Sequence, residues 1–320
     1  MKEINFYKYN RIFGIIAGLF SFVIFSLTVE PTASYWDCAE YISTSAKLQI
    51  GHPPGAPLFQ MLGAIFSILA FDVTQIAYAV NMMSVTSSAL TIMFLFWSIS
   101  LIAKEILKVK EIVKVSYAIK IFGSSFLGSI TFTFTDSFWY NAVEAEVYAM
   151  ATLILALLFW LGLKWVDDFG KVRSDKWLIL ISFVVGLSFG VHFMGLLAIP
   201  SIGLLYYFKK YSEFNIKKFV LANVISVSIL LFIFKLLLPS TLSLFGNLEV
   251  FFVNDLGLPF NSGTIFTAVL LVSIFYYGLS YSSKKKLYWL NTTILCLSFV
   301  FVGFSSWLML PIRSNANTVI

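Results

Sequence analysis

Charged residues are scarce in this sequence of 320 residues. Lysine, arginine, aspartate and glutamate together make up 12% of the chain, against 59% hydrophobic and 18% aromatic residues. A soluble domain carries about 25% charged residues, so a soluble fold of this composition would expose far too much apolar surface. The composition therefore excludes an ordinary soluble domain and indicates that the solvent of the chain is lipid.

Cysteine and repetitive sequence are also nearly absent. The two cysteines, Cys38 and Cys296, are expected outside the membrane and inside a span respectively, so they cannot pair. No low-complexity segment and no repeat at a solenoid period is visible. These absences exclude a disulfide framework and a repeat architecture.

Long apolar windows, by contrast, recur along the whole chain. A hydrocarbon core about 30 Å thick is crossed by a helix of about 20 apolar residues. We predict an all-α polytopic membrane protein with about nine transmembrane helices. They are expected at 12–29, 80–103, 116–135, 147–165, 177–193, 195–208, 218–238, 263–282 and 288–310. The fifth and sixth share one apolar stretch interrupted by Pro200 and are expected to form a tight helical hairpin.

The basic residues are distributed so that they predict a topology. Nineteen of the 22 fall in five clusters, at 2–11, 104–120, 164–176, 209–218 and 284–286. Placing these clusters in the cytoplasm leaves Lys47, Lys235 and Arg313 for the other side, a strong positive-inside bias. The amino terminus is then cytoplasmic, and the net charge of +6 reflects orientation, with no nucleic-acid partner expected. The first apolar run is expected to stay as a span, because Pro31 disfavours cleavage of a secretory signal.

The first non-cytoplasmic loop, residues 30–79, is unusually long. Its segment 35–48 shows helical periodicity with two faces, which predicts an interfacial helix lying on the membrane. The expected polar face holds Asp37, Glu40, Tyr41, Thr44 and Lys47, and the expected apolar stripe holds Trp36, Ala39, Ile42 and Ala46.

Glycine and proline then interrupt this helix. In the segment 49–57, three prolines remove backbone donors and two glycines permit sharp turns. A second helix is expected at 58–71, about 21 Å long and therefore too short to span comfortably. We expect it at the outer interface; if it crossed instead, the basic cluster after Ala103 would lie outside, against the charge bias.

Two acidic groups and two histidines are candidate functional residues on the non-cytoplasmic side. Asp37 and Glu40, one helical turn apart, could accept a proton or hold a cation, or could serve only as solvated acids at a helix start. Glu144 and Glu146 follow the third span among aromatic residues and leave the same two alternatives open. His52 either belongs to a site or caps a turn, and His192 either lines a site or packs.

Two basic residues lie on the same side. Lys235 is expected to snorkel from the outer half of its span. Arg313, just beyond the last span, could recognise a phosphate through its guanidinium fork.

Several of these motifs together resemble a known family. They are Tyr35-Trp-Asp-Cys-Ala-Glu-Tyr41, Gly51-His-Pro-Pro-Gly-Ala-Pro57, Trp139-Tyr-Asn-Ala-Val-Glu-Ala-Glu-Val-Tyr148, Gly190-Val-His192 and Pro311-Ile-Arg-Ser-Asn-Ala-Asn317. The order of a first span, an outside acidic motif, an interfacial helix and the proline-rich turn resembles the GT-C superfamily of membrane glycosyltransferases. The residues of these motifs are similar to those of a bacterial family, described as a domain of unknown function, that is related to eukaryotic protein O-mannosyltransferases.

The resemblance implies a function over essentially the whole chain, a GT-C-like domain of residues 1–320 in the bacterial inner membrane. A sugar would pass from a polyprenyl-phosphate-linked donor to a serine or threonine hydroxyl of a protein, or to another glycan acceptor. It implies Asp37 as catalytic base and Glu40 as its support. The expected substrate-binding residues are His52, Glu144, Glu146, Tyr148, His192, Arg313 and Asn315. Arg313 would hold the lipid phosphate.

Other questions stay open from the sequence. Some members of the superfamily bind a divalent metal at the place of Glu144 and Glu146 and others need none, so a metal is undecided. Relatives usually continue past the last motif, so the chain is either a fragment or a minimal version. A transporter or lipid flippase, and a non-catalytic membrane subunit, are the alternatives to an enzyme.

Overall fold

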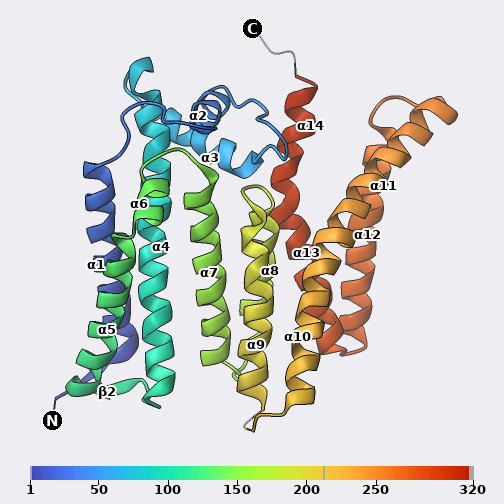
Figure 1. Ribbon diagram of the computed structural model, residues 1–320. Helices are drawn as coiled ribbons and strands as arrows, with labels where there is room; N and C mark the ends of the chain where they lie inside the picture. Colours follow the sequence, from blue (N-terminus) through green and yellow to red (C-terminus); the bar gives the residue numbers. More distant parts are fainter. Residues whose placement is uncertain (1, 212, 317–320) are drawn as a thin grey trace.

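The computed structural model describes residues 2–211 and 213–316. Over these residues the chain is a helical bundle, in which seven helical segments are long and apolar enough to cross a membrane (Figure 1). The prediction of an all-α polytopic membrane protein is confirmed.

The helices of the bundle follow the predicted order. The helices that form the long apolar segments are α1 (Phe6–Leu27), α4 (Ile76–Ile106), α5 (Val115–Thr133), α7 (Val147–Asp167), α10 (Ile216–Leu231) with α11 (Leu238–Val250), α12 (Ser262–Lys284) and α13 (Tyr288–Phe304). Shorter ones are α2 (Cys38–Ala46), α3 (Pro57–Ser67), η1 (Val73–Gln75), α6 (Asp136–Ala142), α8 (Lys176–Ser188), η2 (Phe193–Leu197), α9 (Ala198–Lys210), η5 (Ser305–Leu308) and α14 (Met309–Ser314). Two three-residue strands, β1 (Glu3–Asn5) and β2 (Ile112–Lys114), pair antiparallel, a detail that the sequence did not indicate.

The fifth and sixth predicted spans are the short helices α8 and α9, with 13 residues each. The chain reverses direction between them (Figure 1), but α9 packs against α7 and α10 and α8 packs against α13, so the expected tight packing of the two helices on each other is wrong. Glycine lets α8 pack closely on α13: a Cβ added at Gly186 would lie 2.1 Å from the carbonyl oxygen of Val300. Small residues at such contacts let helix backbones approach inside a membrane.

The seventh predicted span is longer than expected. It does not end at residue 238 but continues as one helical segment, Ile216–Asp255, of 40 residues. Pro239, which should end a helix, is accommodated because the π-helical turn η3 (Phe232–Leu237) comes directly before α11. A π turn shifts the hydrogen-bond ladder, so the donor that proline lacks need not break the helix. A second π turn, η4 (Phe251–Asp255), ends the segment.

Helices α2 and α3 lie across one end of the bundle, and the amino terminus lies at the other end (Figure 1). Both are shorter than predicted, since α2 begins at Cys38 and α3 ends at Ser67. Helix α3, which corresponds to the helix expected at 58–71, lies across the end of the bundle and does not run along the bundle axis (Figure 1). The loops that carry the basic clusters lie at the end of the amino terminus, opposite α2 and α3 (Figure 1).

The predicted polar face of α2 is wrong in part. Tyr41 and Thr44 are buried, whereas Ala39 and Trp36 are exposed. The reason is that α3 packs over α2, with the rings of Tyr41 and Phe59 5.1 Å apart, so α2 is covered from a side that the sequence pattern assigned to water.

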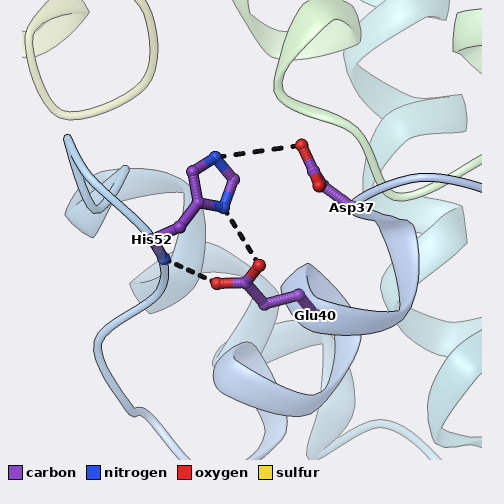
Figure 2. A group of neighbouring side chains, drawn as sticks. All are labelled: Asp37, Glu40 and His52. Atoms are coloured by element: carbon purple, nitrogen blue, oxygen red, sulfur yellow. Dashed lines mark hydrogen bonds and ion pairs between the residues drawn. The ribbon is translucent and has the colours of Figure 1, made fainter.

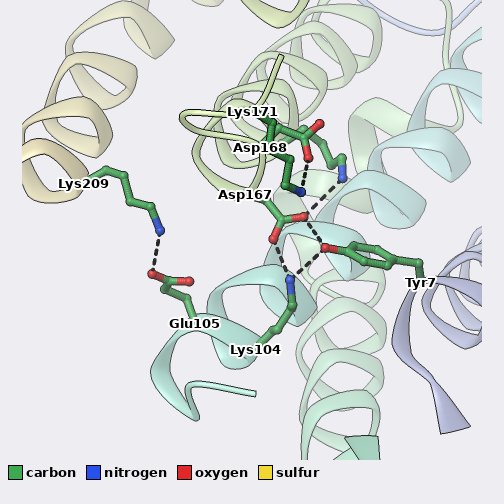
Figure 3. Close-up of polar contacts among 8 residues, drawn as sticks. Tyr7, Lys104, Glu105, Asp167, Asp168, Lys171 and Lys209 are labelled. Carbon is green, nitrogen blue, oxygen red and sulfur yellow. Dashed lines mark hydrogen bonds and ion pairs between the residues drawn. The ribbon is translucent and has the colours of Figure 1, made fainter. Parts of the chain in front are cut away.

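A network of charges joins α1, α4 and α7 at the end of the amino terminus (Figure 3). Lys104 Nζ lies 2.6 Å from Asp167 Oδ1, and the hydroxyl of Tyr7 donates to Asp167 Oδ2 at 2.7 Å. Lys164 Nζ lies 3.4 Å from the same carboxylate. Lys104 and Asp167 each keep 12% of their side-chain exposure, so the pair is largely removed from solvent.

Replacing Asp167 with asparagine is expected to destabilise the bundle by about 3 kcal/mol, because it leaves a buried lysine without its counter-charge. The measurement is thermal unfolding of the purified chain in detergent. Lys171→Gln is the matched control: its pair with Asp168 is on the surface, where Lys171 is 62% exposed, and such pairs contribute less than about 1 kcal/mol. Equal effects of the two substitutions would show that the network does not hold the helices together.

Candidate functional site

Asp37, Glu40 and His52 form one cluster, shown in Figure 2. Glu40 uses both carboxylate oxygens on His52: Oε1 accepts the backbone N–H at 2.6 Å, and Oε2 lies 3.0 Å from ring atom Nδ1. The other ring nitrogen, Nε2, lies 3.8 Å from Asp37 Oδ2. The histidine is thus held between the two acids that the sequence placed one helical turn apart.

The electrostatics of the cluster follow from these contacts. Burial alone would raise the pKa of Glu40, but the hydrogen bonds from the backbone and ring of His52 outweigh it and hold that pKa below its usual value. The hydrogen bond to Glu40 raises the pKa of His52, helped by the charges of Glu40 and Asp37. Glu40 is therefore committed to His52, whereas the Asp37 carboxylate, 53% exposed and without a helix-capping hydrogen bond, is free to meet a ligand.

Gln60, a residue that the sequence analysis did not single out, holds the loop that carries His52. Its side chain is fully buried at the start of α3. With the amide oriented so that each atom meets a complementary partner, the nitrogen donates to the carbonyls of Gln49 at 2.7 Å and Gly55 at 3.1 Å. The oxygen accepts from Gly51 N at 2.9 Å. A side chain at Gly51 would collide with this amide, since an added Cβ would lie 2.7 Å from it.

Substituting Gln60 with leucine is expected to loosen the loop 49–57. The change leaves buried backbone groups without partners, at a cost of about 1–3 kcal/mol. Amide hydrogen exchange in this loop should become faster by about tenfold or more, while exchange in α7 stays as in the wild type. Gln75→Leu is the control, because Gln75 is exposed and makes none of the Gln60 contacts with the loop. Unchanged hydrogen exchange in the loop would contradict the conclusion that Gln60 holds the loop in place.

The second acidic pair is buried. Glu144 and Glu146 are 5% and 7% exposed, so the solvated helix start considered for them is wrong. Glu144 accepts a hydrogen bond from the hydroxyl of Ser34, which ties it to the segment before α2. Glu146 accepts from the backbone N–H of Val147 at 3.2 Å and so caps α7.

Burial raises the pKa of Glu146 to about 7, and the nearby charges of Asp37 and Glu144 act in the same direction. A folded-state pKa above the ordinary 4.5 means that the folded chain binds the proton more tightly than the unfolded chain. The contribution of this group to folding stability is therefore lost as the pH rises from about 4.5 to about 7.

Glu146→Gln is expected to remove this pH dependence. The variant should gain up to about 3 kcal/mol over the wild type at about pH 8 and little at about pH 4, because one pKa unit corresponds to about 1.4 kcal/mol. Thermal unfolding across this pH range gives the difference, with Asp72→Asn as a control at an exposed acid of the same loop region. Parallel curves for Glu146→Gln and the wild type would contradict the assignment.

Tyr148 and His192 meet at the same end of the bundle. Their ring centroids lie 5.6 Å apart, and Nδ1 of His192 accepts from the backbone N–H of Met194 at 3.2 Å. Burial lowers the pKa of His192, which favours the neutral ring. The turn that carries His192 docks on α3, since the N–H groups of Leu58 and Phe59 donate to the carbonyl of Gly190 at 2.8 and 3.2 Å. The proline-rich loop and the His192 turn are therefore neighbours.

Arg313 lines a cavity of about 570 Å³, which we call the Arg313 cavity. Its wall is largely apolar and comes from α3, α8, α13 and the segment after α13, and Leu48 and Met61 contribute to it from the first loop. Among the described residues, Arg313 Nε and the hydroxyl of Ser306, both buried and both at this cavity, have no hydrogen-bond partner. The cavity thus combines apolar walls with unpartnered donors.

The structure does not bring Asn315 to the cluster. Its side chain is exposed, and its amide nitrogen donates to the carbonyl of Pro311 at 2.8 Å, so it closes the last turn of α14. Asn317, the last residue of that motif, lies outside the described residues. The remaining predicted residues, from the first loop, the start of α7, the His192 turn and α14, belong to elements that gather at one end of the bundle (Figure 1).

A cation would find three ligands in the cluster. One possible ligand atom from each of Asp37, Glu40 and His52 lies within 4.8 Å of the other two. In the described part of the chain, these three residues form a group of possible metal ligands. Two carboxylates and an imidazole suit a divalent transition metal and leave coordination positions open to a substrate. Glu144 and Glu146, the pair considered for metal from the sequence, accept hydrogen bonds from Ser34 and Val147.

Comparison with known proteins adds a family to this geometry. Residues 37–215 match the family model described as the protein O-mannosyl-transferase TMEM260 N-terminal domain. This is more than half of the chain and includes both acidic pairs and both histidines, whereas Arg313 lies beyond it. The comparison with solved structures found no match.

Two curated relatives are similar to the chain. One is protein O-mannosyl-transferase tmem260 of Dictyostelium discoideum, 27% identical over 141 residues, which are 44% of this chain and 15% of the relative. The other is protein O-mannosyl-transferase TMEM260 of Mus musculus, 26% identical over 165 residues, which are 52% of this chain and 21% of the relative. The matched part is thus a small fraction of each relative's length.

Proposed function

Because the chain belongs to the family of TMEM260-type protein O-mannosyl-transferase N-terminal domains, we propose that it is a membrane glycosyltransferase acting on proteins. The donor is a sugar linked to a polyprenyl phosphate, and the acceptor is a serine or threonine hydroxyl. The observation that carries the proposal is the exposed Asp37 carboxylate, set 3.8 Å from a histidine that Glu40 holds. An exposed carboxylate supported in this way is suited to general-base catalysis.

In the proposed reaction, the acceptor oxygen attacks the anomeric carbon of the sugar while Asp37 takes the hydroxyl proton. The bond between the anomeric carbon and the phosphate oxygen breaks, and its electron pair leaves with the polyprenyl phosphate. One base and one displacement give inversion at the anomeric carbon. His52 orients the Asp37 carboxylate through Nε2, which lies 3.8 Å from Oδ2, and Glu40 keeps the ring in position.

The Arg313 cavity is the proposed place of the donor lipid. Its apolar walls suit a polyprenyl chain, and the guanidinium, with an unpartnered Nε, suits the phosphate. The loop 49–57, which carries His52, lies near the cavity: Leu48, just before this loop, lines the cavity, and a side chain at Gly55 would lie 3.0 Å from Leu310 of α14. A cation near the departing phosphate stabilises its developing charge.

The proposed orientation follows from the charges. The end with the basic loops faces the cytoplasm, and residues 30–79 form a non-cytoplasmic loop that covers the reaction site. We propose the bacterial inner membrane as its location, with residues 1–320 as a GT-C-like transmembrane domain. If a divalent cation binds at Asp37, Glu40 and His52, it would itself polarise the acceptor hydroxyl, and Asp37 would then act as its ligand instead of as the general base.

The test uses the full chain in proteoliposomes with radiolabelled polyprenyl-phosphate sugars and a serine- and threonine-rich acceptor peptide. Labelled peptide that depends on the chain supports the proposal, and the assay run with and without a chelator decides the metal. Absence of transfer from every donor, together with proton-coupled uptake of a solute, would overturn it in favour of a transporter.

A further inference from the structure

A second cavity, of about 290 Å³, lies at the end of the bundle opposite the candidate site. We call it the Lys209 cavity. The last turns of α4, α7 and α9 form its wall, which includes Ile102, Leu163, Leu205 and Phe208. Three charged residues also line it: Glu105, Asp167 and Lys209.

The charged residues at this cavity differ in whether they could bind a ligand. Asp167 is satisfied, because Lys104 and Lys164 lie 2.6 and 3.4 Å from its carboxylate. Glu105 and Lys209 bridge α4 and α9 at 3.1 Å, with side chains that are 68% and 32% exposed (Figure 3). An exposed pair of this kind is weak, so Lys209 can exchange Glu105 for another anion at little cost.

The surroundings favour an anionic amphiphile. Helices α4 and α7 have the length and apolarity of membrane spans, so the apolar wall borders lipid chains. Basic residues occupy the last turns of all three helices, with Lys104, Lys164, Lys209 and Lys210. Lysines at the edge of a span attract anionic lipid head groups.

We propose that the Lys209 cavity binds one anionic phospholipid. An acyl chain lies against Ile102, Leu205 and Phe208, and the phosphate accepts from Lys209 Nζ in place of Glu105. The site ties α9 to α4 through a lipid. It is separate from the proposed transfer reaction and does not depend on it.

The charge of the head group is tested by native mass spectrometry of the full chain in detergent, titrated with phosphatidylglycerol or phosphatidylcholine. Lys209→Gln should weaken phosphatidylglycerol binding about fivefold and leave phosphatidylcholine unchanged, because one lysine at the interface is removed. Glu105→Gln should have the opposite effect and tighten phosphatidylglycerol binding, since it frees Lys209. The matched control is Lys210→Gln, an exposed neighbour that does not line the cavity and should change binding by less than about twofold.

The apolar wall is tested by Ile102→Trp, which fills the cavity from α4 without changing charge. It should weaken the binding of both lipids. Unchanged phosphatidylglycerol affinity in Lys209→Gln, or weaker affinity in Glu105→Gln, would overturn the proposal. Thermal unfolding of each variant shows whether the bundle is intact, and both rim positions are exposed enough for it to remain so.

Discussion

Asp37→Asn is expected to lower the rate of sugar transfer by about 10²–10⁴-fold, the contribution of a positioned general base. Asparagine keeps the size of the side chain but cannot take the acceptor proton. The KM for the lipid-linked donor should stay within about twofold, because the donor is proposed to bind through its phosphate and polyprenyl chain at the Arg313 cavity. Initial rates at varied donor concentration, in proteoliposomes, measure both constants.

Asp72→Asn is the matched control for this substitution. Asp72 lies in the same predicted loop, is fully exposed, and accepts from the backbone N–H of Thr74 at 2.8 Å. Asparagine caps a helix as well as aspartate does, so neither folding nor transfer should change. Equal transfer rates for Asp37→Asn and the wild type would remove the base assignment.

The sequence predicted the bundle well because its signals are local. Apolar windows locate spans, and the basic clusters locate the loops between them. The end of the seventh span could not be predicted in this way. Pro239 is a strong local stop signal, and only the hydrogen-bond pattern of the preceding π turn, η3, shows that the helix continues.

The candidate site was predicted in its residues but not in its contacts. Spacing placed Asp37 and Glu40 one turn apart, yet it could not show that both meet His52, which lies across a loop whose path is set by tertiary packing. The burial of Tyr41 and Thr44 was missed for the same reason, since α3 covers α2. Gln60 had one usable signal, a lone amide within an apolar helix.

The two buried glutamates show the limit of a charge pattern. An alternating acidic pair before a span predicts helix capping and solvation equally well as a binding site. In the structure Glu146 does cap α7, as the first alternative requires, but it does so while buried and with a pKa of about 7. Such a shift arises from three-dimensional packing and the nearby Asp37, and no spacing rule contains it.

Arg313→Gln is expected to lower kcat/KM for the lipid-linked donor by about 10²-fold or more, the cost of removing one donor that stabilises charge on a leaving group. In the proposed site the guanidinium binds the phosphate before the transfer, and it binds more strongly as negative charge develops on the phosphate. The substitution should therefore raise KM and lower kcat. Arg313→Lys keeps the charge but loses the fork, and should recover part of the loss. The measurement is the same donor titration, together with binding of a polyprenyl phosphate without sugar.

Lys235→Gln is the control, since Lys235 is a cation on an exposed face of η3 and does not line the Arg313 cavity. It should leave donor kinetics unchanged. Arg313→Gln could lower kcat/KM only by lowering the melting temperature. In that case, at a temperature where all three forms are folded, the two variants would match the wild type in kcat/KM and in the binding of polyprenyl phosphate. Weaker binding to Arg313→Gln than to Arg313→Lys, at equal stability, separates phosphate recognition from packing and links the cavity to the acidic cluster through the donor itself.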